Sequence, residues 1–140
     1  NKIFQYASVG EVPQSTAYKN EPTELRIGDN NTIREFCTLH VGTVEGGGIT
    51  QIGDDNFLMA YVHIAHDCIL GNKIIFANGS SIAGHVVVGD MLIFGSFNLI
   101  HKFCKIGAHV LSGIGAISFK DIPPLFKVAG NTALPFGIYV

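Results

Sequence analysis

The sequence predicts an all-β protein, a left-handed parallel β-helix of hexapeptide repeats with three hexads per coil and loop excursions. Three observations support this fold class: a strict six-residue period, small residues directly after most of the periodic positions, and Gly-rich or Pro-rich segments where the period slips. The chain of 140 residues has single-domain length, and we expect residues 1–140 to form one β-helix domain.

Large apolar residues recur every six positions through the middle of the chain. These anchors are Ile52, Leu58, Ile64, Leu70, Phe76, Ile82, Val88, Phe94, Ile100 and Ile106. A helix would repeat about every 3.6 residues and a half-buried strand every two, so neither explains the pattern. Three hexads close one coil of about 18 residues, which fills its interior with the anchors and stacks on the next coil at about 4.8 Å.

The period also predicts where loops leave the coil. Ile27, Ile33 and Leu39 extend the series upstream, but Ile52 lies 13 positions after Leu39, one hexad plus seven, so the Gly-rich segment 43–49 is expected to loop out. Residues 1–24 hold no clean hexads, and we interpret 9–22 as a second loop.

Near the C-terminus the period is lost. No clear anchor series follows Leu111, and Pro123 with Pro124 is predicted to end the regular coils.

Composition excludes several classes of protein. Hydrophobic residues make up 47 % and charged residues 14 %, which argues against disorder. The net charge of −2 with scattered basic residues makes nucleic acid an unexpected partner. No apolar run approaches the roughly 20 residues that span a bilayer, so we expect no transmembrane segment.

Three cysteines without a CxxC motif indicate reduced thiols. Cys68 and Cys104 are two coils apart, about 9.6 Å by the strand spacing, which is too far for a disulfide. Cys37, like the other two cysteines, lies four residues after an anchor. Reduced thiols favour a cytoplasmic location.

Five of the six histidines are predicted to share one face of the solenoid. They are His40, His63, His66, His85 and His101. When the hexads are assigned to three faces in rotation, His63 falls at the corner leading into this face, and His40 joins it if the 43–49 loop is left out. Isolated histidines on half-exposed strands need have no function, but five on one face suggest proton chemistry near neutral pH.

A metal site is an alternative for the same residues. Zinc prefers three convergent imidazoles with an open fourth position. His63 and His66 are three residues apart with Asp67 adjacent, whereas carbonic anhydrases of the hexapeptide class pair ligand histidines five apart. We favour acid–base chemistry and expect neither a metal nor a cofactor.

The acid–base interpretation assigns a place to each polar residue of this face. His66, two positions after its anchor, should point outward to meet a substrate. Asp67 lies one coil before His85, so these two should stack and share a hydrogen bond. Gly84 lies one coil after His66, where its amide could stabilise an oxyanion, and Lys102 follows one coil later.

Together, the motifs HIAHDC, AGHV, IGAHV, GGGIT and GNTALPFG resemble the UDP-N-acetylglucosamine 3-O-acyltransferases, hexapeptide-repeat enzymes that begin lipid A synthesis. The likeness covers essentially all 140 residues. It implies a homotrimer, with active sites between neighbouring solenoids, that transfers a (3-hydroxy)acyl chain from acyl carrier protein to the sugar 3-hydroxyl. Because family members are longer, we expect N-terminal coils and a C-terminal helical domain to be missing here.

The resemblance also implies residue roles. His66 would be the general base, Asp67 would support it, and the Gly84 amide would hold the oxyanion. The resemblance implies that Gln14, His63, His85 and His101 bind substrate. We add His40 and Lys102 because they are predicted to lie on the same face.

Some positions depart from the family pattern. Ser15 and Ala17 replace charged residues of the nucleotide-sugar loop, and Thr132 and Tyr139 replace a histidine and an asparagine. Lys102 replaces a glutamine, and we expect it to contact a pyrophosphate or the phosphopantetheine of the donor.

The resemblance places the acyl-chain pocket near Leu111 and Ile114. Ile114 stands where glycine is common, which predicts a shorter acyl chain.

Two alternatives to this enzyme remain. One is a non-catalytic trimeric β-helix paralogue. The other is a related hexapeptide acyltransferase that acylates an amine or transfers acetyl from coenzyme A.

Overall fold

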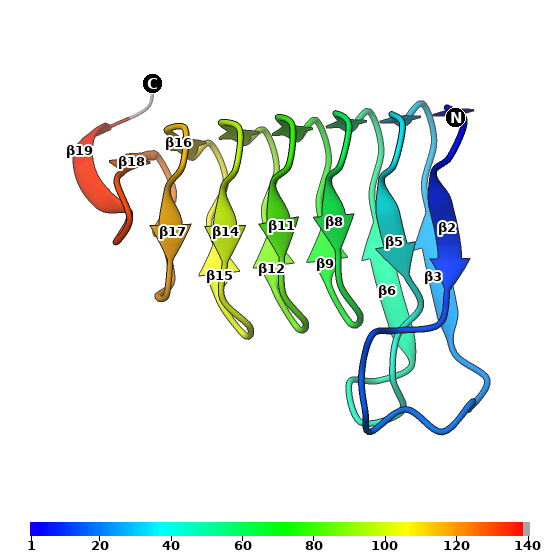
Figure 1. Cartoon of the computed structure of the whole chain (residues 1–140). Helices are drawn as coiled ribbons and strands as arrows, with labels where there is room; N and C mark the ends of the chain where they lie inside the picture. The colour runs from blue at the N-terminus through cyan, green and yellow to red at the C-terminus, as the bar shows by residue number, and fades with distance from the viewer. Residues whose placement is uncertain (139–140) are drawn as a thin grey trace.

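The computed structural model describes residues 1–138, which form a left-handed parallel β-helix, and the predicted fold class is confirmed. Successive short strands pass around three sheets, so that each coil contributes one strand to each sheet. Figure 1 shows the coils side by side along the solenoid axis, with the N-terminal coil at one end and β19 at the other. Among the described residues there is no helix long and apolar enough to cross a membrane.

The three sheets are named here A, B and C in the order in which the chain visits them. Sheet A contains β1 (Lys2–Ile3), β4 (Thr32–Ile33), β7 (Phe57–Leu58), β10 (Ile75–Phe76), β13 (Ile93–Phe94), β16 (Leu111–Ser112), β18 (Phe126–Ala129) and β19 (Leu134–Ile138). Sheet B contains β2 (Ser8–Glu11), β5 (Thr38–His40), β8 (His63–Ile64), β11 (Ser81–Ile82), β14 (Leu99–Ile100) and β17 (Ile117–Ser118). Sheet C contains β3 (Glu24–Ile27), β6 (Ile49–Ile52), β9 (Ile69–Leu70), β12 (Val87–Val88) and β15 (Lys105–Ile106).

The anchors set the register between coils. Ile64 pairs with Ile82 and Ile82 with Ile100, each one coil further along the same parallel sheet. All ten predicted anchors are at most 3 % exposed, so they fill the interior of the solenoid as the period predicts. Phe76 and Phe94 stack inside it with ring centroids 4.5 Å apart.

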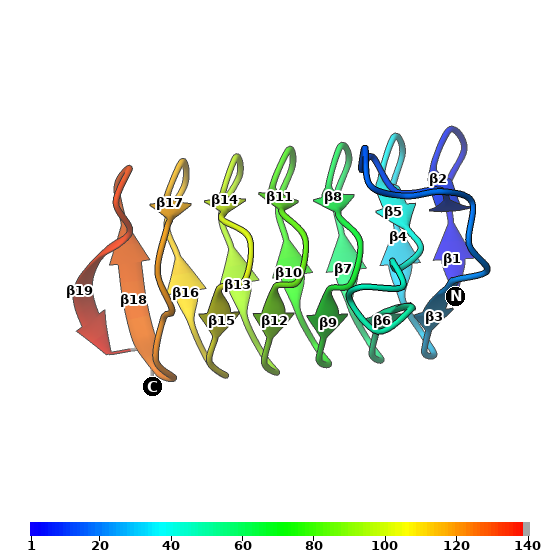
Figure 2. The same ribbon diagram turned by 90° about the horizontal axis from the view of Figure 1, so that it is seen from below.

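The predicted loops are present, and both leave the solenoid between sheets B and C. The Gly-rich excursion ends at Gly48, because Ile49 already belongs to β6. Leu39 pairs with Ile64, so the looped-out segment restores the register as expected. The second loop spans residues 12–23, between β2 and β3, and the two loops lie on the same side of the solenoid in Figures 1 and 2.

Residues 1–11 show no clean hexads in the sequence but form coil strands, and the loop predicted at 9–22 begins only after Glu11. β1 pairs with β4 and β2 pairs with β5, both in parallel. Ile3 pairs with Ile33 and Val9 with Leu39, so Ile3 and Val9 occupy anchor positions six residues apart. Two anchors before a long loop are too short a series for the period to stand out.

The prolines also do not end the coils. Ile122 bridges Ile106 in parallel, and β18 pairs in parallel with β16 beyond them, before β19 closes the sheet antiparallel. Ser112 and Ser118 occupy the buried anchor positions here, which a search for large apolar residues misses. Pro123 and Pro124 lie between Ile122 and β18, outside the strands, where no strand hydrogen bond needs their missing N–H.

The three cysteines are free and buried, as predicted. Burial raises the pKa of the Cys68 thiol to about 12, and burial likewise raises the pKa of Cys37 and of Cys104. These thiols are therefore core residues with little thiolate character.

Replacing Phe76 by alanine should lower the free energy of unfolding by about 3–5 kcal/mol, because it empties a fully buried position and removes the stack with Phe94. Chemical denaturation followed by circular dichroism measures the change. Phe97→Ala is the matched control, since its side chain is 63 % exposed. Equal losses from the two substitutions would contradict this account of the core.

Candidate active site

A groove of about 600 Å³ runs along the outer face of sheet B. Its walls are formed by Gln14, His40, His63, Ala65, His66, Ser81, Ile82, Ala83, Gly84, Leu99, Ile100, His101, Ile117 and Phe119. Strand residues on this face point outward in alternation with the buried anchors, so residues from distant parts of the sequence meet in one groove. Gln14 joins them from the 12–23 loop.

The predicted convergence of histidines is therefore present. His40, His63, His66 and His101 line the groove, and His85 lies beside His66 with ring centroids 5.1 Å apart. The predicted position of His63 at a corner is wrong, because it is the first residue of β8. Each two-residue strand begins one position before its anchor, so the preceding residue belongs to the strand and faces outward.

His66 and Asp67 form the central pair of the groove. The Nδ1 atom of His66 lies 2.7 Å from Oδ2 of Asp67. A carboxylate can only accept a hydrogen bond, so Nδ1 carries the proton and the Nε2 lone pair is left free. The His66 side chain is 21 % exposed at the groove, and Nε2 can therefore accept a proton from a bound substrate.

Asp67 is held in place on its other side by the chain around the Gly-rich loop. Its side chain is only 1 % exposed. Oδ1 accepts from the Thr43 amide at 2.7 Å, and Oδ2 accepts from the Thr43 hydroxyl at 2.6 Å. The Asp67 amide donates to Thr50 Oγ1 at 2.8 Å. The backbone of Asp67 has a positive φ of 60°, a conformation that Asp tolerates better than most residues.

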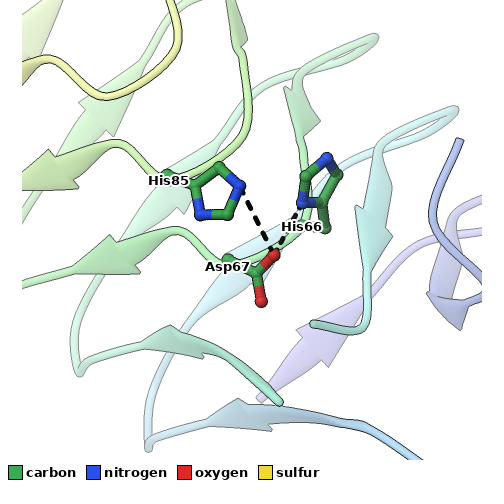
Figure 3. Close-up of side chains that lie close together, drawn as sticks. All are labelled: His66, Asp67 and His85. Carbon is green, nitrogen blue, oxygen red and sulfur yellow. Dashed lines mark hydrogen bonds and ion pairs between the residues drawn. The ribbon is translucent and has the colours of Figure 1, made fainter. Parts of the chain in front are cut away.

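His85 approaches the same carboxylate oxygen from the next coil. Its Nε2 lies 3.8 Å from Asp67 Oδ2, which is longer than a hydrogen bond but close enough for attraction. Figure 3 shows His66 and His85 directed at this one oxygen. On its other face, the His85 ring stacks on Phe103 at 4.5 Å. The predicted stacking of Asp67 and His85 is thus present without the predicted hydrogen bond.

The same three side chains resemble a set of metal ligands in spacing, since possible ligand atoms of His66, Asp67 and His85 lie within 4.8 Å of one another. Both Asp67 oxygens, however, already accept hydrogen bonds from Thr43, and Oδ2 also accepts from His66. A cation bound here would have to displace the His66 Nδ1 proton and the Thr43 hydroxyl. The donor arrangement fits an acid–base pair better than a metal centre.

Gly84 lies directly against the His66 ring. A side chain at this position would place its Cβ 2.6 Å from His66 Cε1 and 2.9 Å from Nε2, so only glycine leaves the imidazole its present position. Within residues 1–138 the Gly84 amide has no acceptor, and Gly84 lines the groove. An N–H group of this kind beside the base is suited to stabilising an oxyanion.

A second histidine pair lies further along the groove. Thr38 Oγ1 is 2.7 Å from Nδ1 of His63, and the His63 ring meets the His40 ring edge to face at 5.1 Å. Burial lowers the pKa of His63, and burial lowers the pKa of His40 against a weaker opposing effect of Glu11. Both rings therefore favour the neutral form, which can both donate and accept hydrogen bonds.

Several predicted residues lie outside this groove in the single chain. Lys102 is exposed at the corner after His101, and Ile114 is 74 % exposed at the corner between sheets A and B. Leu111 belongs to β16 of sheet A. Thr132 lines a separate cavity at the C-terminal end of the solenoid, and Tyr139 lies outside the described residues.

The structure also adds residues that sequence reasoning missed. Leu99, Ile117 and Phe119 form the apolar end of the groove. They could have been found as the positions directly before or after the anchors of sheet B. Thr43 lies in a loop and could not be found in this way, because no period predicts that the loop returns to Asp67.

Comparison with known proteins identifies several relatives of this chain. Residues 49–84 match the bacterial transferase hexapeptide (six repeats) family. The acyl-[acyl-carrier-protein]–UDP-N-acetylglucosamine O-acyltransferase of Thiobacillus denitrificans is 56 % identical over 138 residues, which cover 99 % of this chain and 54 % of that protein. The chain thus spans about half the length of the curated relatives that it matches.

Solved structures agree with this relationship. LpxA from Acinetobacter baumannii is 51 % identical with a TM-score of 0.96, over 97 % of this chain and 53 % of that one. The UDP-N-acetylglucosamine O-acyltransferase (LpxA) of Moraxella catarrhalis RH4 is 44 % identical with a TM-score of 0.98, over 99 % and 54 %. A perosamine N-acetyltransferase from Caulobacter crescentus, 19 % identical with a TM-score of 0.73, shares the fold, with 97 % of this chain and 57 % of that one covered.

The lowered pKa values of His40 and His63 predict a pH-dependent stability. The unfolded chain binds these protons at about pH 6.5 and the folded chain only at lower pH, so acid favours unfolding. The free energy of unfolding should therefore fall as the pH drops below about 6.5 and level off below the folded pKa values.

Urea denaturation across this range, on the wild type and on the double variant His40→Gln, His63→Gln, measures the effect. The double variant should have a flatter pH dependence, and His109→Gln, an exposed histidine at another corner, serves as control. A double variant with the slope of the wild type would show that these rings do not cause it.

Proposed function

We propose that this chain, which belongs over nearly its whole length to the UDP-N-acetylglucosamine O-acyltransferases, carries the acid–base centre of such an enzyme. The observation that carries this proposal is the His66–Asp67 hydrogen bond, because it leaves the Nε2 lone pair of His66 free at the groove. The acyl donor is an acyl carrier protein and the acceptor is the sugar 3-hydroxyl of UDP-N-acetylglucosamine, which places the reaction in lipid A biosynthesis.

The proposed chemistry is a direct acyl transfer. His66 Nε2 takes the proton of the sugar hydroxyl while its oxygen attacks the thioester carbon. The carbonyl oxygen becomes an oxyanion, which the Gly84 amide stabilises. The intermediate then breaks its carbon–sulfur bond, and the departing thiolate takes the proton from His66. Atoms and charges balance without a metal or a cofactor.

Asp67 contributes by holding the imidazole and by stabilising its positive charge during the reaction. The neutral pair His40 and His63, together with His85 and His101, then contacts the sugar and the donor. Gln14 adds a polar contact from the 12–23 loop.

The apolar end of the groove is where the acyl chain would begin. Leu99 and Phe119 line it within this chain. We propose that a neighbouring subunit of a homotrimer completes the groove. This would bring the exposed Ile114 and the nearby Leu111 to the far end of the groove, where they would limit the length of the acyl chain that fits. Lys102, exposed beside His101, then contacts a phosphate of the nucleotide or of the donor arm.

The intact acid–base centre argues against the alternative of a non-catalytic paralogue. A protein that only assembled would not require glycine at position 84 against the His66 ring or a carboxylate buried behind it. The remaining candidate donors and acceptors can be distinguished by incubating the purified protein with UDP-sugars and with either acyl carrier proteins or acyl-coenzyme A. The mass of the product then identifies the donor and the acceptor that react.

Replacing His66 by glutamine should lower turnover by about 10²–10⁴-fold, since the general base is removed while a polar side chain of similar reach is kept. Mass spectrometry of the acylated sugar measures the rate. His109→Gln should retain wild-type turnover. If His66→Gln acylates the sugar at a rate within a few-fold of wild type, the proposed base is wrong.

A further inference from the structure

The Gly-rich loop at 43–48 has so far only the role of an insertion, yet it makes the closest contacts to the proposed catalytic pair. Thr43 donates both its amide and its hydroxyl to the two oxygens of Asp67. Thr43 also holds the loop together, because its carbonyl accepts from the amides of Gly46 and Gly48 at 3.1 and 2.7 Å. One residue thus connects the fold of the loop to the orientation of the carboxylate.

We infer that Thr43 is a positioning residue: it fixes Asp67 so that Oδ2 faces His66, and thereby selects the tautomer of His66 that can act as a base. The inference rests on the proposed function for its effect on catalysis. Its structural part, the control of the His66 tautomer, stands on the contacts alone.

The loop lies in direct contact with the Asp67 carboxylate. A Cβ added at Gly46 would overlap the Asp67 carboxyl group. One added at Gly42 would lie 2.8 Å from Oδ1 and would also overlap the backbone at Ile49. The glycines therefore allow the loop to lie against Asp67 and exclude water, which agrees with the 1 % exposure of its side chain.

The hydroxyl of Thr43 matters because two histidines compete for one oxygen. Asp67 Oδ2 lies 2.7 Å from His66 Nδ1 and 3.8 Å from His85 Nε2. Two donors from Thr43, one on each oxygen, prevent rotation of the carboxylate about its terminal bond. Oδ2 thus remains the oxygen nearest to His66. Because Oδ2 accepts the hydrogen bond from His66 Nδ1, the proton stays on Nδ1.

Without the hydroxyl, one of these two restraints is lost. The Thr43 amide can still bind Oδ1, but Oδ2 can then turn toward His85, and His66 can bind its proton on either nitrogen. A ring protonated on Nε2 has no lone pair at the groove and cannot accept the proton of a substrate. Substrate contacts are unchanged, since Thr43 does not line the groove.

The decisive experiment compares Thr43→Val, Thr43→Ala and Thr43→Ser in the purified protein. Thr43→Val keeps the shape and removes the hydroxyl, Thr43→Ala removes it without added bulk, and Thr43→Ser keeps it. Thr32→Val, the same change on sheet A, is the matched control. Long-range proton–nitrogen NMR spectra identify the His66 tautomer, and steady-state kinetics with acyl carrier protein and UDP-N-acetylglucosamine give kcat and both KM values.

Thr43→Val and Thr43→Ala should show a mixture of His66 tautomers and a kcat lowered by about 10–100-fold, with both KM values within a few-fold of wild type. Thr43→Ser and Thr32→Val should match the wild type in both measurements. If Thr43→Ala keeps a single Nδ1-protonated tautomer, or if Thr43→Ser is impaired as much as Thr43→Val, the inference is overturned.

Failure of the proposed function would look different. In that case no variant and no wild type acylates the sugar, while the NMR spectra still report whether Thr43 selects the tautomer. A purely structural role for Thr43 would lower stability in Thr43→Val and Thr43→Ala without changing the tautomer, which would also overturn the inference.

Discussion

The buried carboxylate of Asp67 is the point on which the rest of the site depends. It is desolvated, and three donors, the Thr43 amide, the Thr43 hydroxyl and His66 Nδ1, satisfy its two oxygens. A buried charge is tolerated only when it is hydrogen-bonded in this way. Because these donors come from the loop before β6 and from the corner after β8, the carboxylate joins the loop, the corner and the base into one rigid unit.

The β-helix makes this unit possible by repeating one short strand at a fixed spacing. Each coil returns to the same face, so the period alone brings His66 and Gly84 together from neighbouring coils. The steric fit of Gly84 against the imidazole shows how little space this stacking leaves, since a single methyl group there would displace the ring. Histidines line the groove near His63, and apolar side chains line it near Phe119, an arrangement that suits the proposed sugar and acyl substrates.

Much of this could be predicted from sequence, because the period alone determines which anchors stack. From the period we predict the coil, the face that carries the histidines, and the position of Asp67 beside His85. The period failed where anchors were small, as at Ser112 and Ser118, or where only two preceded a loop, as at Ile3 and Val9. The contact between Thr43 and Asp67 could not be predicted, because the path of a loop depends on packing and not on a repeat.

The catalytic role proposed for His66 requires that Asp67 act as an acceptor and keep the proton on His66 Nδ1. The substitution Asp67→Asn tests it most directly, because it preserves size and the Oδ1 acceptor for the Thr43 amide but presents an NH₂ group to His66. We expect Asp67→Asn to fold and to bind UDP-N-acetylglucosamine as the wild type does, with turnover lower by about 100-fold or more because His66 is held in the wrong tautomer. Turnover equal to that of the wild type would contradict it.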